Sequence, residues 1–394
     1  MQSFSRILQK MNYSQTLVMS AKTRFLKEKG IDVINLSIGE PDFSPPFFIL
    51  EAAKKAIDQA HHYYTPIAGY LELREAICDK FLRDNSLYYN PSQIVVSAGA
   101  KQAISNLFLS LLNTGDNVII ASPFWVSYYE LVNMCEAIPV IIKTSIYTDF
   151  KITTEQLEEA ITPNTKIFIF NSPCNPSGAV YSYDELKCLS EVLVKHSQLI
   201  IISDEIYEPI NYSEAHYSIG AFTEIYEQTV TLNGLSKGFS MTGWRIGYIG
   251  ASEWIAKACE KVQGQTTSGS CSIAQQSAII ALKSHPNRIV YMIETFRKRR
   301  DLVLDMMKEI PYFRFNRPTG TFYLFPNIKN IFGKTFLGVK ISNAIDLSMF
   351  LLEKAQVAIV CGISFGEENC LRISYAASEE TLKEAFKRIK RMLS

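Results

Sequence analysis

Short runs of apolar residues recur along the middle of the chain, each followed by a polar or small-residue stretch. The runs that we interpret as strands are residues 94–96, 118–120, 167–170, 199–202, 230–232 and 246–249. The first four runs are apolar at every position, which is typical of strands buried on both faces. Helical stretches alternate with them, so the pattern predicts an α/β fold whose mostly parallel sheet carries helices on both faces.

One helix can be placed from its periodicity. Its apolar side chains recur three and four positions apart, at Ile104, Leu107, Phe108, Leu111 and Leu112. The small residues 97–99 form a tight loop directly before it. Free amides at a helix N-terminus attract anions, so the loop 97–101 is either a phosphate site or an ordinary strand–helix turn. The Gly-x-Gly-x-x-Gly spacing of dinucleotide sites is missing.

The segment 235–248 reads Leu-Ser-Lys-Gly-Phe-Ser-Met-Thr-Gly-Trp-Arg-Ile-Gly-Tyr and contains a candidate nucleophile. Lys237 has two small neighbours, so its amine is open to a carbonyl group, and lysine forms Schiff bases with carbonyl cofactors. Ser236 and Arg245 can share the oxygens of a phosphate, the arginine through its planar fork. The alternative is a solvated lysine on a loop.

Other candidate ligand groups follow the ends of predicted strands. Trp125 either stacks on a flat ligand ring or belongs to the core. Asn175 lies in a loop stiffened by two prolines and a glycine. Asp204 follows an apolar run and either pairs with a cationic group or caps the next helix. Because parallel strands end at one edge, we expect the loop 97–101, Trp125, Asn175, Asp204 and Lys237 to converge.

In this order, the motifs resemble those of the class I aminotransferases, fold-type I enzymes that use pyridoxal 5'-phosphate (PLP), and especially bacterial-type aspartate aminotransferases. The resemblance implies that Lys237 is catalytic and binds PLP covalently. The cofactor-binding residues that it implies are Gly99, Ala100, Lys101, Trp125, Asn175, Asp204, Tyr207, Ser236, Lys237, Arg245 and Tyr64. The substrate-binding residues that it implies are Gly39, Lys101, Trp125, Asn175 and Arg372. Arg372, inside an apolar strand, would bind the α-carboxylate through two parallel hydrogen bonds.

The resemblance also implies the organisation of the chain. Residues 46–284 would form a large PLP-binding domain around a seven-stranded sheet, and residues 1–45 with 285–394 would form an N-terminal arm and a smaller α+β domain. Tyr64, in a Tyr-x-x-x-x-Gly element, would reach the PLP phosphate of a neighbouring subunit. We therefore expect a homodimer with active sites shared across the interface.

Composition narrows the class of protein further. A formal net charge of +1 over 394 residues indicates neither nucleic acid nor an anionic membrane as a partner. No run of 18 apolar residues is present, the N-terminal residues lack the apolar core of a signal peptide, and the eight cysteines form no Cys-x-x-Cys pair. We therefore expect reduced thiols in a cytoplasmic protein. The adjacent His61 and His62 diverge and lack a third ligand, so no metal site is expected.

The substrate is less strongly indicated than the reaction. By the resemblance, Lys101 would face a distal carboxylate, with Ser14 and Thr16 of the arm assisting. This favours aspartate as the amino donor and a 2-oxo acid such as 2-oxoglutarate as the acceptor, in a ping-pong reaction. Asn12 stands where prephenate-accepting relatives carry a basic residue, which puts that activity in doubt. The alternatives are an aromatic or LL-diaminopimelate transaminase, a C–S lyase on the same fold and, remotely, a non-catalytic regulator, which the missing basic face disfavours.

Overall fold

The largest sheet has seven strands and lies in the middle of the chain. The structure is a computed structural model that describes residues 4–11, 15–213 and 215–394. The strands are β2 Ile94–Ala98, β3 Asn117–Ala121, β4 Ile138–Ile142, β5 Thr165–Asn171, β6 Ile200–Asp204, β7 Thr229–Gly234 and β8 Ile246–Gly250. Their order is β2-β8-β7-β6-β5-β3-β4, and β8 alone runs opposite to the other six strands. The predicted mostly parallel, seven-stranded sheet is confirmed.

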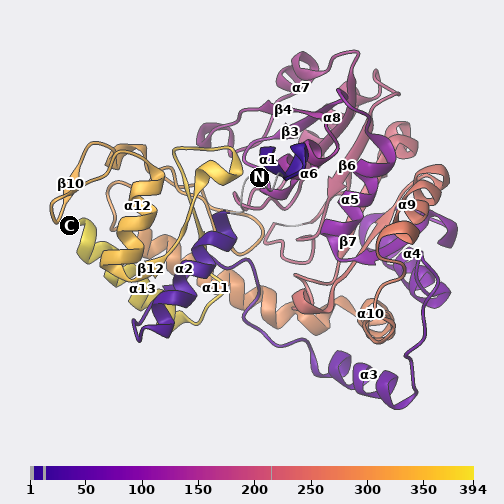
Figure 1. The fold of residues 1–394 in the computed structure, drawn as a ribbon, viewed down its shortest axis with the longest axis horizontal. Coiled ribbons are helices and arrows are strands. Elements are labelled where there is room, and N and C mark those ends of the chain that lie inside the picture. Colours follow the sequence, from indigo (N-terminus) through magenta and orange to yellow (C-terminus); the bar gives the residue numbers. More distant parts are fainter. Residues whose placement is uncertain (1–3, 12–14, 214) are drawn as a thin grey trace.

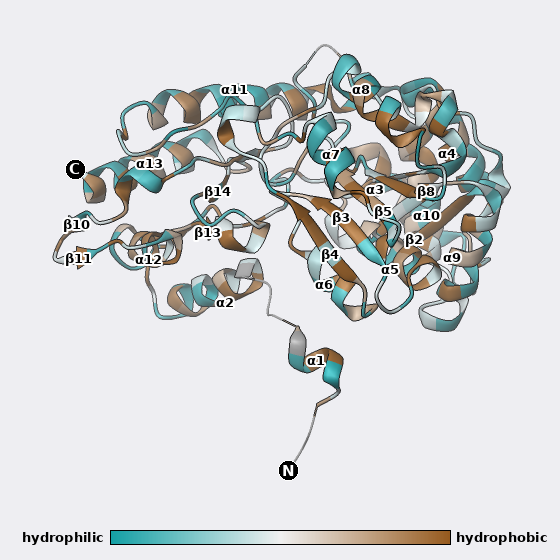
Figure 2. Ribbon diagram, turned by 90° about the horizontal axis from the view of Figure 1, so that it is seen from above, coloured by the Kyte–Doolittle hydropathy of each residue, from teal (hydrophilic) through white to brown (hydrophobic). Residues whose placement is uncertain are grey.

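Helices cover both faces of this sheet (Figure 1). One face carries α5 Ala100–Leu111, α6 Ser127–Met134 and α9 Glu253–Thr266. The other carries α4 Leu71–Asn85, α7 Thr154–Ala160, α8 Tyr183–Leu193 and α10 Ser272–Lys283, with α3 Phe47–Asp58 packed on α10. In β5, Ile167 and Ile169 pack on the α5 side, whereas Phe168 and Phe170 pack on the α8 side. Figure 2 shows the resulting hydrophobic strands between helices with hydrophilic outer faces.

The two ends of the chain pack together beside this sheet. The helices there are α2 Gln15–Glu28, α11 Val290–Met307, α12 Ala344–Phe350 and α13 Glu379–Leu393, whereas α1 Arg6–Lys10 contacts α6. The strands are β1 Ile34–Asn35, β9 Tyr323–Leu324, β10 Thr335–Phe336, β11 Val339–Lys340, β12 Val357–Ala358, β13 Val360–Cys361 and β14 Leu371–Ser374. Parallel pairing of β1 with β12 joins the N-terminal segment to the C-terminal part, and β14 lies between β13 and β9. Figure 1 shows α11 running between this group and the large sheet.

The two longer N-terminal helices, α2 and α3, begin at Gln15 and Phe47. Pro46 directly precedes α3, and its fixed φ favours the start of a helix. Among the described residues, none of the helices combines the length and apolar character needed to cross a membrane.

Candidate active site

A cavity of about 270 Å³ collects most of the predicted site residues. Those that line it are Gly39, Ala100, Lys101, Trp125, Asn175, Asp204, Tyr207, Ser236, Lys237, Arg245 and Arg372. Thr16 of the arm lines it too, whereas Ser14 and Asn12 lie outside the described residues. Tyr64 is not part of the lining, and its side chain is 98% exposed. The predicted convergence of strand-end groups is therefore present within a single chain, with Tyr64 on the surface.

One end of the cavity combines a helix N-terminus with an arginine side chain. Gly99 caps the N-terminus of α5 with a φ of +84°. A Cβ added to Gly99 would come 2.1 Å from Nη2 of Arg245. The guanidinium is held there because Nη1 donates to the carbonyl of Thr242 at 2.9 Å and Nη2 to that of Ala98 at 3.3 Å. Glycine thus leaves room for a cation directly over free helix amides, an arrangement that fits a phosphate group.

The amine of Lys237 is positioned inside the cavity. Its Nζ donates a hydrogen bond to the carbonyl of Gly39 at 2.7 Å and lies 5.8 Å from the ring centre of Tyr207. Burial lowers the pKa of Lys237 to about 8; the charge of Glu40 opposes this shift, and Arg372 adds to it. A sizeable fraction of the amine is therefore neutral near physiological pH and can act as a nucleophile or base.

Asp204 supplies a buried carboxyl group at the end of β6. Its side chain is 3% exposed; Oδ2 accepts from the hydroxyl of Tyr128 at 2.5 Å and Oδ1 from the amide of Ile206 at 3.1 Å. Burial raises the pKa of Asp204 to about 6, and the hydrogen bond from Tyr128 opposes this. A cationic ligand group beside it would restore its charge, so the carboxyl fits a protonated ring nitrogen.

Arg372 presents unused hydrogen-bonding capacity. Its side chain is 3% exposed; Nη2 donates to the carbonyl of Ser37 at 2.7 Å and Nη1 to Oδ1 of Asn175 at 3.2 Å. The guanidinium also lies 4.6 Å from the ring centre of Tyr323. Its buried Nε has no hydrogen-bond partner among the described residues. Because a buried guanidinium needs anionic partners, this site fits a carboxylate ligand.

A second cation lies at the start of α5. The Nζ of Lys101 is 5.1 Å from the ring centre of Trp125, and both residues line the cavity. Burial lowers the pKa of Lys101, and the positive charge of Arg245 adds to this shift. An anionic ligand would relieve both effects.

Sequence reasoning missed two tyrosines of the site. The hydroxyl of Tyr323 lies 2.9 Å from that of Tyr207, and a Cβ on Gly39 would come 2.8 Å from it. Tyr128 follows Trp125 by three residues, and the two rings meet edge to face at 5.5 Å. This one-turn spacing is a signal that could have found Tyr128, whereas Tyr323 lies in an apolar strand that offers none.

An amine of lowered pKa, set between an anion-binding helix terminus and a buried carboxyl group, provides the donor set that covalent binding of PLP needs. The fold and the site thus define a PLP-dependent enzyme. Residues 31–389 match the family described as aminotransferase class I and II, and the chain belongs to this family.

Individual relatives support the same assignment. The aspartate/prephenate aminotransferase of Cereibacter sphaeroides is 44% identical over 388 residues, covering 98% of this chain and 97% of the relative. The crystal structure of the aspartate aminotransferase from Rhizobium meliloti has a TM-score of 0.96 and 38% identity, and the match covers 100% of this chain and 99% of that one. The aspartate aminotransferase from Thermus thermophilus with maleate has a TM-score of 0.94 and 38% identity, covering 100% of both chains. The predicted family, reaction class and cofactor are confirmed.

Proposed function

We propose that the chain transfers the amino group of L-aspartate to a 2-oxo acid such as 2-oxoglutarate in a ping-pong reaction. The observation that carries this proposal is a pair of cations, Arg372 from β14 and Lys101 from α5, that line one cavity with Lys237. Aspartate has two carboxylates, so Arg372 would bind the α-carboxylate and Lys101 the distal one. The names of the relatives support this substrate class, as does the Thermus thermophilus structure with maleate, which is also a dicarboxylate.

Several residues of the site have a proposed task toward the cofactor. When bound, PLP supplies an aldehyde that reacts with an amine and a ring that accepts the electron pair left at the substrate's Cα. The proposed contacts for the phosphate are the backbone amides of Gly99, Ala100 and Lys101 and the side chains of Ser236 and Arg245. The others are Trp125 for the ring face, Asn175 and Tyr207 for the phenolic oxygen, and Asp204 for the ring nitrogen.

Lys237 would also move the proton at the substrate's Cα. Because burial lowers the pKa of Lys237 to about 8, a sizeable fraction of the released amine is neutral and can accept this proton. Gly39 would lie against the substrate's carboxylate beside Arg372, where Tyr323 leaves no space for a larger residue.

The proposed assembly is a homodimer. Tyr64 is 98% exposed and its neighbour Tyr63 is 78% exposed, which suits aromatic side chains that enter a partner's site. We also propose the domain division at 46–284 against 1–45 and 285–394. A cytoplasmic location is consistent with eight free cysteines.

Aromatic amino acids are the second candidate substrates. A mainly apolar hollow of about 840 Å³ shares Lys101, Val126 and Ser127 with the active-site cavity. Phe124 and Tyr129 are part of its lining. Such a hollow next to the site would suit a bulky apolar side chain.

A half-reaction screen tests these proposals. Purified protein is loaded with PLP, each amino acid is added alone, and the change in cofactor absorbance and the product are recorded. We expect aspartate to react fastest and to yield its oxo acid, and borohydride to trap PLP on Lys237. Faster reaction of aromatic amino acids would favour the second candidate, release of pyruvate and ammonia would indicate a lyase, and no trapped PLP at Lys237 would refute the proposed role of this lysine.

A further inference from the structure

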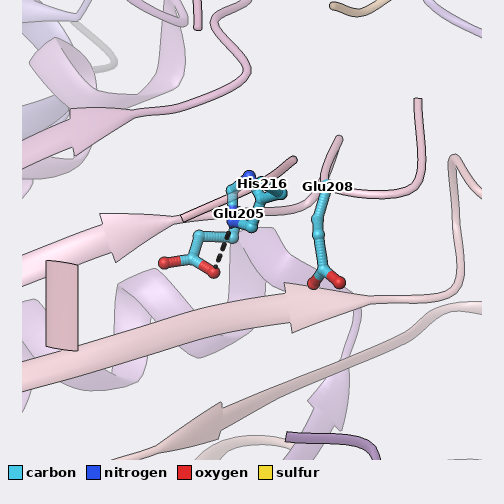
Figure 3. A group of neighbouring side chains, drawn as sticks. All are labelled: Glu205, Glu208 and His216. Carbon is cyan, nitrogen blue, oxygen red and sulfur yellow. Dashed lines mark hydrogen bonds and ion pairs between the residues drawn. The ribbon is translucent and has the colours of Figure 1, made fainter. Parts of the chain in front are cut away.

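The segment 204–208, at the end of β6, directs some side chains to the active-site cavity and others away from it. Asp204 and Tyr207 line the active-site cavity. Glu205 and Glu208 lie outside that lining and are only 1% and 9% exposed. Figure 3 shows both glutamates with His216 beyond the strand end. Buried carboxylates require partners, so the second side of this segment must be held by other parts of the chain.

Glu208 connects three elements through one oxygen. Its Oε2 forms an ion pair with Nζ of Lys80 on α4 and accepts from Nδ2 of Asn233 at 2.5 Å. Burial opposes ionisation, but the charges of Lys80 and His216 and the hydrogen bond from Lys80 act together against it, and the pKa of Glu208 is lowered. Asn233 lies on β7, and its Oδ1 accepts from the amide of Gly234 at 2.7 Å. Lys237 follows only four residues after Asn233.

Glu205 has partners at both of its carboxylate oxygens. Its Oε2 lies 2.6 Å from the hydroxyl of Ser218, 3.1 Å from Nδ2 of Asn85 and 2.9 Å from Nε2 of His216. Its Oε1 accepts from the hydroxyl of Ser203 at 2.9 Å. Burial acts to lower the pKa of His216, but the charge and hydrogen bond of Glu205 outweigh it and raise the pKa.

The same residues resemble a metal site at first sight. One ligand atom each from Glu205, Glu208 and His216 lies within 4.8 Å of the others. However, Lys80 already forms an ion pair with Glu208, and Nε2 of His216 already lies 2.9 Å from Oε2 of Glu205. A metal ion would have to displace the buried ammonium of Lys80, so this group is a closed ion-pair network and not a metal site.

We propose that Glu208 is a positioning residue for the transamination reaction. Through Asn233 it ties the segment that carries Tyr207 to the strand that leads to Lys237, and through Lys80 it anchors both to α4. Loss of its charge frees these two cofactor-facing segments to shift against each other. The inference rests on the proposed roles of Tyr207 and Lys237. A displacement of about 1 Å at a reacting group can cost up to about 100-fold in rate.

The test is Glu208→Gln, which keeps the shape but removes the charge. We expect kcat with aspartate to fall about tenfold or more while the KM of aspartate changes less than about threefold, because Arg372 is not part of the network. A second measurement needs no bound cofactor: competitive acetylation of the apoprotein reports the pKa of Lys237. We expect this pKa to move away from its wild-type value, near 8.

Two controls separate positioning from lost stability. Glu185→Gln makes the same change at another ion pair, in which Oε1 of Glu185 lies 2.5 Å from Nζ of Lys151. Leu189→Ala opens a cavity at a buried leucine of α8. Both are expected to retain the wild-type kcat and the wild-type pKa of Lys237. If Glu208→Gln does not fold, Asn233→Ser replaces it, since it shortens the link to β7 and leaves the Lys80 pair intact.

The outcomes distinguish this inference from the proposed function. If Glu208→Gln, or Asn233→Ser in its place, matches Leu189→Ala in kcat and leaves the pKa of Lys237 unchanged, Glu208 has only a structural role. The inference is then wrong, and the proposed aminotransferase function is unaffected. If the wild-type protein itself fails to transfer the amino group of aspartate, the proposed function is wrong.

Discussion

Replacing Gly99 with alanine tests the contact on which the proposed phosphate site depends. The substitution adds a Cβ that would lie 2.1 Å from Nη2 and 2.6 Å from Cζ of Arg245, so the guanidinium must move. It also places a side chain on a residue with a φ of +84°, a conformation that suits glycine. The two effects can be separated because the chain contains a matched glycine.

Gly115 provides this control. Its φ is +89°, and an added Cβ would meet nothing within 4 Å. Gly99→Ala and Gly115→Ala should therefore both lose about 1–3 kcal/mol of unfolding free energy to backbone strain. Only the former displaces Arg245, and a lost hydrogen bond to a charged group is worth about 1.5–3 kcal/mol. We expect the affinity for PLP to fall roughly 10- to 100-fold in Gly99→Ala and to remain unchanged in Gly115→Ala.

The assay is titration of each apoprotein with PLP, followed by absorbance, together with urea unfolding of the apoproteins. Equal stability losses with unequal dissociation constants would support the reasoning. Equal dissociation constants in the two variants would refute it, because the phosphate would then not depend on where Arg245 lies.

The apoprotein of Lys237→Met should be more stable than the wild type below pH 8. There the amine of folded wild-type Lys237 is charged, and burial of this charge destabilises the folded state. This advantage should fade between pH 8 and 10.5, as the folded and then the unfolded wild type lose that proton; urea unfolding across pH would show it, and a constant difference would contradict it. Arg372→Leu should raise the KM of aspartate and lower kcat/KM about 100-fold without loss of PLP absorbance, and an unchanged KM would exclude its carboxylate role. Tyr128→Phe removes a donor to Asp204, so the pKa of Asp204 should rise further and shift the acid limb of the pH profile upward; an identical profile would show that Asp204 does not control it.

The strands that the sequence pattern missed show where local reasoning stops. The apolar runs do not include β4, which contains Pro139 and lies at the edge of the sheet beside β3 only. An edge strand tolerates proline and is partly exposed, so it lacks the uniform apolar signature of the central strands. The helix α2 also lacks a clear signature, because its apolar and polar side chains are weakly segregated and give no clear helical periodicity.

The sequence by itself predicted the central strands of the large sheet, the glycine turn before α5 and the lysine proposed to react. These depend on short-range patterns: apolar runs that need burial, glycine where only glycine fits, and polar groups just after strand ends. Tertiary structure alone decided which partners these groups meet. The amine of Lys237 bonds to a carbonyl 198 residues away, and Arg372 bonds to one 335 residues away. The network around Glu208 is likewise assembled from α4, β7 and the loop after β6, because burial of charge selects partners by proximity in space, which sequence spacing does not encode.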